Sequence, residues 1–166
     1  MLGQVSLRPV TPADAGFLRL LHLDSHPELR QLPLPQVAAD QLVQLQLDAQ
    51  LAQYRTSFPH ALDQLIETDD AAVGRCWISL SATELRLLDI AVLSTHRGNG
   101  IGRTVLTGLC QRGDATGVPV TLSVWSDNAG AQRLYRRLGF EAGIQSHGYL
   151  QMSRTPATAA DAAEGA

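Results

Sequence analysis

The sequence is poor in cysteine and aromatic residues and has no excess of positive charge. Its two cysteines, Cys76 and Cys110, lie far apart in apolar surroundings and form no C-x-x-C pair. We therefore expect buried thiols, and neither a disulfide nor a metal or redox site. The formal net charge is −3 and the sequence pI is near 5.9. Because nucleic-acid-binding surfaces are usually basic, these values argue against nucleic acid as the main partner.

Long hydrophobic runs are also missing. No apolar stretch approaches the ~20 residues that a membrane-spanning helix needs, and the N-terminus lacks the charged start and apolar segment of a signal peptide. We therefore predict a cytoplasmic protein with no membrane partner. The length of 166 residues and the apolar fraction of 45% predict one globular domain. This domain is expected over residues 1–154, followed by a flexible, alanine-rich tail at residues 155–166.

Two common phosphate-binding motifs are absent, but the chain has one glycine-rich stretch of a different pattern. The chain has no Gly-Lys-Ser/Thr, and the glycines at 98, 100 and 102 do not fit G-x-G-x-x-G. They lie between an apolar run at residues 85–93 and a helical pattern that starts at Gly100. Glycines let several backbone N–H groups turn towards one anion, and the helix N-terminus adds its own donors. The predicted pyrophosphate-binding loop consists of Arg97, Gly98, Asn99, Gly100, Ile101, Gly102 and Arg103.

Two motifs resemble those of the GNAT N-acetyltransferase family. Arg97-x-x-Gly100-x-Gly102 is similar to the family's Arg/Gln-x-x-Gly-x-Gly/Ala signature. Downstream, Asn128-x-x-Ala131-x-x-Leu134-Tyr135-x-x-x-Gly139-Phe140 resembles the family's Asn-x-x-Ala-x-x-Leu-Tyr-x-x-x-Gly-Phe helix. The resemblance covers residues 73–152. It implies acetyl-CoA as the donor and direct transfer of the acetyl group to an amine in a ternary complex.

The same resemblance implies the fold class. We expect a single α/β (α+β) domain whose central, mostly antiparallel sheet has about seven strands, a splayed parallel pair and about four flanking helices. Periodicity predicts strands at residues 5–10, 61–67, 73–81, 85–93, 120–125, 140–146 and 149–153. It predicts helices from the cap Thr11 to 23 and at 39–55, 100–116 and 128–138. The apolar positions of the first three helices are Phe17, Leu18, Leu20 and Leu21; Leu42, Leu45, Ala49 and Ala52; and Ile101, Val105, Leu106 and Leu109.

The resemblance also assigns residues to the donor. The backbone of Ala91, Val92 and Leu93 would pair with the pantetheine arm, and an N–H near Val92 would stabilise the oxyanion. Asn128 and Tyr135 are seven residues apart and therefore share one helix face. Their implied roles are an amide beside the arm and a phenol that protonates the departing thiolate. The alternative for Tyr135 is packing alone, beside Leu134 and Leu138.

The general base is less well specified by the sequence. Asp89 is the first candidate because it is the only acid within an apolar strand, and Glu84, at the start of that strand, is the second. The alternative for Asp89 is a salt bridge to Arg86 or to a neighbouring strand. Ser123 occupies a place where some relatives carry glutamate, so that route looks closed. A water chain to bulk solvent is a further alternative.

The acceptor site falls in the first half of the chain, where the resemblance is general. Gln46, Gln50 and Tyr54 are spaced by four residues, so their polar groups could face a substrate; a solvated, amide-rich helix face is the alternative. His22 and His26 could share a helix face but have no nearby acid, so no metal site is predicted. We expect a small-molecule primary amine as acceptor, with a protein or peptide amine or a non-catalytic acyl-CoA-binding module as alternatives. A homodimer paired through the final strands would fit the family.

Overall fold

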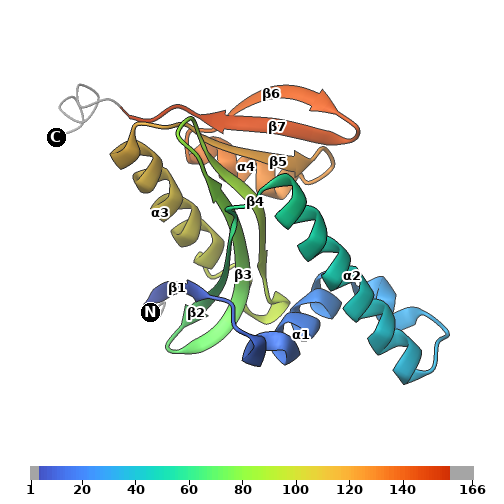
Figure 1. Cartoon of the computed structure of the whole chain (residues 1–166). Helices are drawn as coiled ribbons and strands as arrows, with labels where there is room; N and C mark the ends of the chain where they lie inside the picture. Colours follow the sequence, from blue (N-terminus) through green and yellow to red (C-terminus); the bar gives the residue numbers. More distant parts are fainter. Residues whose placement is uncertain (1–3, 158–166) are drawn as a thin grey trace. The chain divides into compact units, whose positions relative to one another are not determined.

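The computed structural model describes residues 4–157 and confirms the predicted order of strands and helices (Figure 1). The strands are β1 (Val5–Pro9), β2 (Leu62–Thr68), β3 (Ala71–Leu80), β4 (Leu85–Val92), β5 (Val120–Trp125), β6 (Glu141–Ser146) and β7 (Tyr149–Arg154). The helices are α1 (Ala15–Ser25), α2 (Gln36–Ser57), α3 (Ile101–Thr116) and α4 (Ala129–Arg137). Three short 3-10 helices complete the order: η1 (Pro12–Asp14), η2 (Pro27–Gln31) and η3 (Ser94–His96).

Contacts divide the chain into two compact units, and strands β3 and β4 run through both. The first unit contains the residues up to Trp77 and Asp89–Gly102; the second contains Ile78–Leu88 and the residues from Arg103. The seven strands are hydrogen-bonded in the order β1-β2-β3-β4-β5-β7-β6. Strands β4 and β5 pair in parallel over residues 85–87 and 120–122. The predicted mixed sheet with one parallel pair is therefore confirmed.

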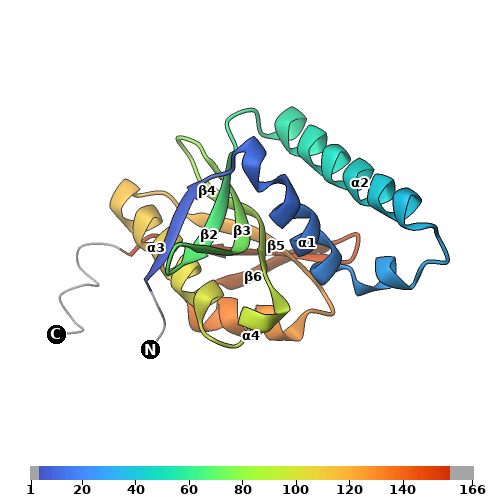
Figure 2. The same ribbon diagram turned by 90° about the horizontal axis from the view of Figure 1, so that it is seen from below.

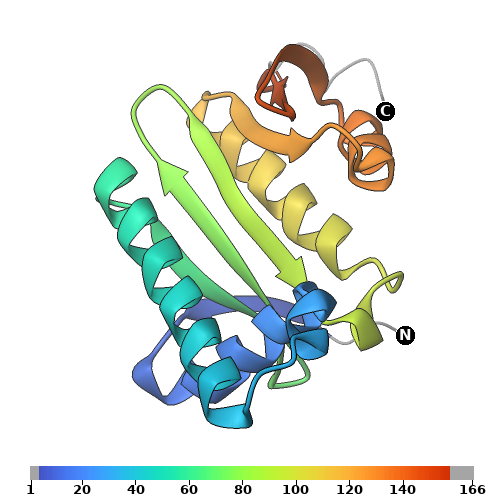
Figure 3. The ribbon, with the colours of Figure 1, turned by 90° about the vertical axis from the view of Figure 1, so that its right-hand side faces the viewer.

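In the first unit, β1 pairs antiparallel with β2, from Val5 opposite Thr68 to Pro9 opposite Gln64. Asp69 and Asp70 have φ values of 50° and 63° and form the tight turn into β3. Figure 3 shows β3 and β4 running side by side in opposite directions. Helices α1 and α2 lie next to each other (Figure 2) and cover one face of these strands.

Two expectations about the N-terminal helices are wrong. Leu20 is 49% exposed and Leu45 is 66% exposed, although both were expected on buried faces. Helix α2 begins at Gln36, directly after Pro35, and its most buried residue is Val43. Its inward face therefore follows Val43 and includes polar residues, because apolar and amide side chains are spread around the whole helix and the spacing alone does not select a face.

The elements that follow the glycine-rich loop match their predictions closely. The expected stripe of α3 is buried, with Ile101, Val105, Leu106 and Leu109 all at most 5% exposed. Gly117 and Gly139 follow α3 and α4 with φ values of 69° and 88°, as expected for residues that end helices. His147 and Gly148 form the turn of the β6–β7 hairpin, which is clearly visible in Figure 1.

The predicted tail starts at Thr155, and only residues 155–157 of it are described. The backbone N–H of Ala157 donates to Asp114 at 2.7 Å, and Arg154 forms a bidentate ion pair with the same carboxylate. Residues 158–166 lie outside the described part of the chain. Across residues 4–157, no helix combines the length and hydropathy of a membrane span.

Candidate active site

A backbone hydrogen bond at the end of β4 shows which groups face β3 and which face the opposite edge of the strand. The N–H of Leu93 donates to the carbonyl of Val73 on β3 at 2.9 Å. Because successive residues of a strand point their backbone groups to opposite edges, Val92 presents its N–H and carbonyl away from β3. The carbonyl of Val92 accepts from Nε of Arg97 at 2.8 Å. The N–H of Val92, to which the family resemblance gives the oxyanion role, therefore points away from β3; that role stays a prediction.

The glycine-rich loop has the backbone geometry that an anion needs. Gly98 and Gly100 adopt φ values of 79° and 80°, which only glycine takes up readily. A Cβ at Gly98 or Gly102 would meet no atom within 4 Å, so both positions border open space. Within residues 4–157, the backbone N–H groups of Gly98 and Asn99 donate to no protein acceptor. Helix α3 then starts at Ile101, so the positive end of its dipole directly follows the loop. These features fit the pyrophosphate of acetyl-CoA.

Asp24, at the C-terminal end of α1, holds the start of the glycine-rich loop in place. Its carboxylate accepts from both the backbone N–H and the hydroxyl of Ser94, and it pairs with Arg97. The hydrogen bond from the Ser94 hydroxyl and the one from its N–H hold the pKa of Asp24 below its usual value. The sequence contains no local signal for this contact, because the partners are 70 residues apart.

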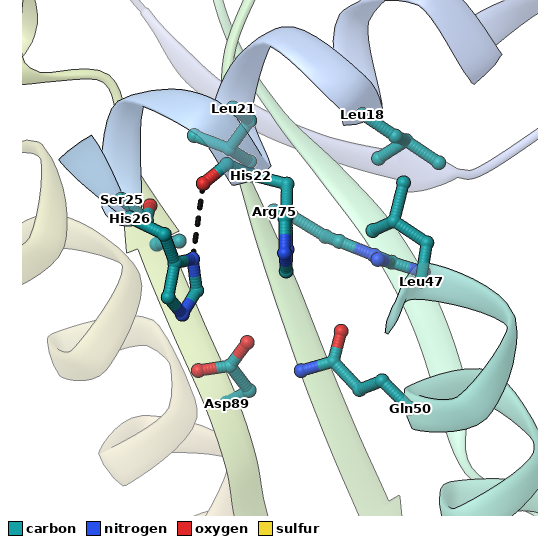
Figure 4. Close-up of a pocket in the computed structure, with 10 residues that line it drawn as sticks. Leu18, Leu21, His22, Ser25, His26, Leu47, Gln50, Arg75 and Asp89 are labelled. Atoms are coloured by element: carbon teal, nitrogen blue, oxygen red, sulfur yellow. Dashed lines mark hydrogen bonds between the residues drawn. The ribbon is translucent and has the colours of Figure 1, made fainter. Parts of the chain in front are cut away.

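A small pocket of about 50 Å³ opens between α1, α2, β3 and β4, all within the first unit (Figure 4). It is lined by Leu18, Leu21, His22, Ser25, His26, Leu47, Gln50, Arg75, Asp89 and Ala91. The pocket thus brings together the first-choice base, Asp89, and one of the residues expected to contact the acceptor, Gln50. The pocket also contains His22 and His26, for which the sequence predicts no metal site. No group of three metal-ligating side chains occurs in the described chain.

The three residues Gln46, Gln50 and Tyr54 face inwards, but only Gln50 lines the pocket. Gln46 accepts from Nε2 of His22 at 2.7 Å, and the Tyr54 ring lies 5.1 Å from the Trp77 ring. A fully solvated, amide-rich helix is therefore wrong for this face of α2. The glutamines at positions 41, 44 and 53 lie on the exposed side of α2, where the prediction of a solvated, amide-rich face holds.

Asp89 is a partly buried carboxyl, and Arg75, whose charge acts on it, is paired with another acid. Arg75 forms a bidentate ion pair with Asp63, at 2.7 and 2.6 Å. Burial raises the pKa of Asp89, and the charge of Arg75 opposes this increase. Among residues 4–157, Asp89 forms no salt bridge. The predicted alternative of a pair with Arg86 is not found, because Arg86 donates to Ser123 at 2.8 Å.

Glu84, the second candidate base, directly precedes β4 in the second unit. Its Oε2 accepts from the hydroxyl of Thr121 at 2.6 Å. The same face carries a polar network in which Arg86 also reaches Gln151, and Ser123 donates to Gln151 at 2.8 Å. Glu84 and Asp89 are five positions apart, so on a regular strand their side chains point to opposite faces. Whether Glu84 takes part in proton transfer stays a prediction.

Helix α4 carries the second motif. The side-chain oxygen of Asn128 accepts from the N–H of Ala131 at 3.0 Å and so caps the helix. A contact of the Asn128 amide with the cofactor stays a prediction. Tyr135 is 8% exposed, and its ring lies 5.8 Å from that of Phe140. Packing is therefore one role of Tyr135, while proton donation stays a prediction.

The family model described as acetyltransferase (GNAT) family matches residues 21–140. The chain belongs to the GNAT family. The family's acyl donor is acetyl-CoA, and the loop geometry fits its pyrophosphate.

Curated relatives and solved structures extend this result. This GNAT chain is 37% identical over 84 residues to N-alpha-acetyltransferase 40 of Saccharomyces cerevisiae, covering 46% of this chain and 30% of the yeast protein. It is 31% identical over 88 residues to a putative [ribosomal protein bS18]-alanine N-acetyltransferase of Bacillus subtilis, covering 51% of this chain and 57% of that protein. The matches therefore span about a third and just over half of these relatives.

Among solved structures, the PaiA N-acetyltransferase of Thermoplasma acidophilum in complex with coenzyme A shares the fold. The TM-score is 0.67 at 14% identity, over 92% of this chain and 99% of that chain. At this identity the likeness concerns the fold alone.

Proposed function

We propose that this protein is an acetyl-CoA-dependent N-acetyltransferase that acetylates the α-amine of a polypeptide by direct transfer. The observation that carries the donor assignment is the glycine-rich loop: Gly98 and Gly100 have positive φ, and within residues 4–157 the N–H groups of Gly98 and Asn99 donate to no protein acceptor, which fits a pyrophosphate. The names of the yeast and Bacillus subtilis relatives specify acetylation of an α-amine or of a ribosomal protein. These names favour a polypeptide over the small-molecule amine that the sequence puts first.

The chemistry assigns separate tasks to the residues of the chain. Acetyl-CoA supplies an acetyl thioester, so transfer forms a C–N bond, breaks a C–S bond and leaves a thiolate that needs a proton. Asp89 accepts the proton that the acceptor ammonium must lose. The N–H of Val92 polarises the thioester carbonyl. Tyr135 gives a proton to the thiolate, which is reasonable because a thiol has a pKa near ~8.5 and a phenol one near ~10. The second N–H proton, which the acceptor nitrogen loses after the C–N bond forms, restores the phenol.

An α-amine suits a modest base. Its ordinary pKa is about 7.7–8.0, whereas that of a lysine side chain is about 10.4, so far less work is needed to obtain the neutral form at neutral pH. Cys76 does not provide a covalent route, because burial raises the pKa of its thiol to about 12. These two facts favour direct attack by a free amine over an acyl-enzyme.

The first test is thermal unfolding with and without acetyl-CoA, followed by thiol release with a panel of acceptors. Binding to the native state alone stabilises it by about 2.7 kcal/mol at a hundredfold excess over Kd. Peptides with free N-termini are expected to release CoA faster than the same peptides blocked at the N-terminus. Faster release with polyamines or free amino acids would favour a small-molecule acceptor, and no melting shift would contradict the donor site.

Tyr135→Phe separates an enzyme from a binding module. We expect a fall in kcat of at least tenfold with an unchanged Kd for acetyl-CoA. Equal rates of acetyl-CoA consumption by the parent and the variant, at the level of background hydrolysis, would instead support a non-catalytic acyl-CoA-binding module.

A further inference from the structure

The ring orientation of His26 is fixed by its own helix. Its Nδ1 lies 3.0 Å from the carbonyl oxygen of His22, one turn earlier (Figure 4). A carbonyl oxygen can only accept a hydrogen bond, so Nδ1 must carry the hydrogen. In the neutral ring, Nε2 is then the nitrogen with the free lone pair. His26 therefore presents a proton acceptor on the side of the ring that faces away from the helix backbone.

That side of the ring faces the pocket. His26 and Asp89 both line it, and Figure 4 shows the imidazole edge directed towards the Asp89 carboxylate. Asp89 is partly buried, whereas His26 is exposed at the C-cap of α1. The acid thus lies inside the pocket and the imidazole at its rim, in the order that a proton leaving the pocket would need.

We propose that His26 is a proton relay that takes up, through Nε2, the proton that Asp89 removes from the acceptor ammonium, and passes it to solvent. This inference rests on the proposed function. An N–H bond of the ammonium breaks as its proton moves to the Asp89 carboxylate, leaving a neutral amine. The proton on Asp89 then moves to Nε2, which gives an imidazolium. Release of this proton to water restores the carboxylate and the neutral imidazole.

The charged groups around Asp89 are compatible with this transfer. Two of them, Arg75 on β3 and Asp63 on β2, neutralise each other in a bidentate pair. The Cys76 thiol on β3 is held in its neutral form by burial. Helix α2 contributes only the amide of Gln50 to the pocket's polar lining. The α1 segment contributes His22, the Ser25 hydroxyl and His26.

His22 cannot replace His26 in this role as the structure stands. Its Nε2 lies 2.7 Å from Oε1 of Gln46, so that nitrogen donates to α2. The two rings stack with centroids 4.3 Å apart. His22 therefore supports the His26 ring, and His26 is the histidine whose lone pair faces the carboxyl.

The kinetic test compares His26→Gln and His26→Ala with His60→Gln, an exposed histidine in the turn before β2. At pH 7, His26→Gln is expected to lower kcat for a peptide acceptor by 10- to 100-fold, with an unchanged Kd for acetyl-CoA. The deficit should shrink above pH 9, where the α-amine is already neutral, and added imidazole should restore part of the rate of His26→Ala. Rates of His26→Gln within twofold of the parent across pH 6–9 would overturn the proposal.

If no acceptor is acetylated, the proposed function itself has failed. A second measurement tests the interaction of His26 with Asp89 independently of activity. Nitrogen-15 NMR of the imidazoles at high pH should show His26 protonated at Nδ1 and not at Nε2. Asp89→Asn should change the Nε2 shift of His26 and leave that of His60 unchanged. A neutral ring protonated at Nε2, or a His26 signal unaffected by Asp89→Asn, would exclude the relay.

Discussion

The carboxylate of Asp24 accepts two hydrogen bonds from Ser94, one from its hydroxyl at 2.5 Å and one from its backbone N–H at 2.7 Å. This contact fixes the end of α1, which carries His22 and His26, to the first turn after β4. Arg97 lies 3.4 Å from the same carboxylate and donates to the Val92 carbonyl. One acid thereby links the pocket to the glycine-rich loop.

Ser94→Ala is expected to loosen this link. A hydrogen bond to a charged group is worth about 1.5–3 kcal/mol; because Ser94 is exposed, we expect a loss of unfolding free energy of about 1.5 kcal/mol. The Kd for acetyl-CoA should rise several-fold, because the loop must then be ordered on binding. Denaturant unfolding and calorimetric titration measure the two effects. Thr95→Ala, which removes only a contact to the adjacent His96, is the matched control.

The same contact has a defined pH dependence. The folded-state pKa of Asp24 is depressed, so its stabilisation is present above the unfolded value of about 3.9 and is lost as pH falls through the folded value. The stability difference between the parent and Ser94→Ala should therefore be constant from pH 5 to 8 and disappear in strong acid. A difference that peaks near pH 6.5 would point to a histidine instead.

Asp89→Asn is expected to stabilise the folded protein at neutral pH, whereas the loss of a paired carboxylate usually destabilises it. Burial raises the folded-state pKa of Asp89, so ionisation of this group at neutral pH opposes folding. Its contribution is fully present below the unfolded pKa of about 3.9 and is lost as pH rises through the folded value. The variant is expected to melt at a higher temperature than the parent at pH 7–8, with no gain near pH 4, while peptide acetylation falls about 100-fold.

Asp63→Asn is the matched control for Asp89. It removes one partner of the buried pair with Arg75, in which both side chains are less than one fifth exposed. We expect it to lower the unfolding free energy by about 3 kcal/mol. Equal destabilisation by the two substitutions would show that Asp89 has a structural salt-bridge role.

Gly100→Ala and Gly102→Ala test the loop. Gly100 has a φ of 80°, so a side chain there costs about 1–2 kcal/mol and shifts the loop. Gly102 lies in the first turn of α3 with open space around it, and the family signature accepts alanine at this position. We expect the Kd for acetyl-CoA to rise at least tenfold in the first variant and to stay within threefold in the second. Equal affinities for both would contradict the assignment of the loop to the pyrophosphate.

Gly74→Ala probes the approach of β3 to β4. A Cβ at this buried position would overlap the carbonyl oxygen of Ala91 and press on Ile66. We expect a loss of about 2–3 kcal/mol, measured by denaturant unfolding. Gly108→Ala, within α3 and with no atom within 4 Å, should instead stabilise the protein by up to about 1 kcal/mol. A neutral Gly74→Ala would mean that the two strands can separate at low cost.

Several parts of the fold could be predicted because the governing interactions are local. The apolar stripe of α3 is read from a 3.6-residue period, and the positive φ of Gly98, Gly100 and Gly139 follows from the sterics of a missing Cβ. The parallel pairing of β4 and β5 follows from the helix between them. In each case a residue interacts with its own segment of the chain, so the spacing of residues in the sequence predicts the interaction.

The inward face of α2 and the link from Asp24 to Ser94 could be decided only by the tertiary structure. Gln50 faces the pocket while Leu45 is exposed, because the position of α1 and not the polarity of α2 selects which side is buried. In the same way, the role proposed for His26 depends on Asp89, which lies 63 residues further along the chain and lines the same pocket. The sequence by itself determined the family, the place of the glycine-rich loop before α3 and the order of elements. Which side chains meet in the pocket depends on packing between distant segments, and no local spacing encodes that.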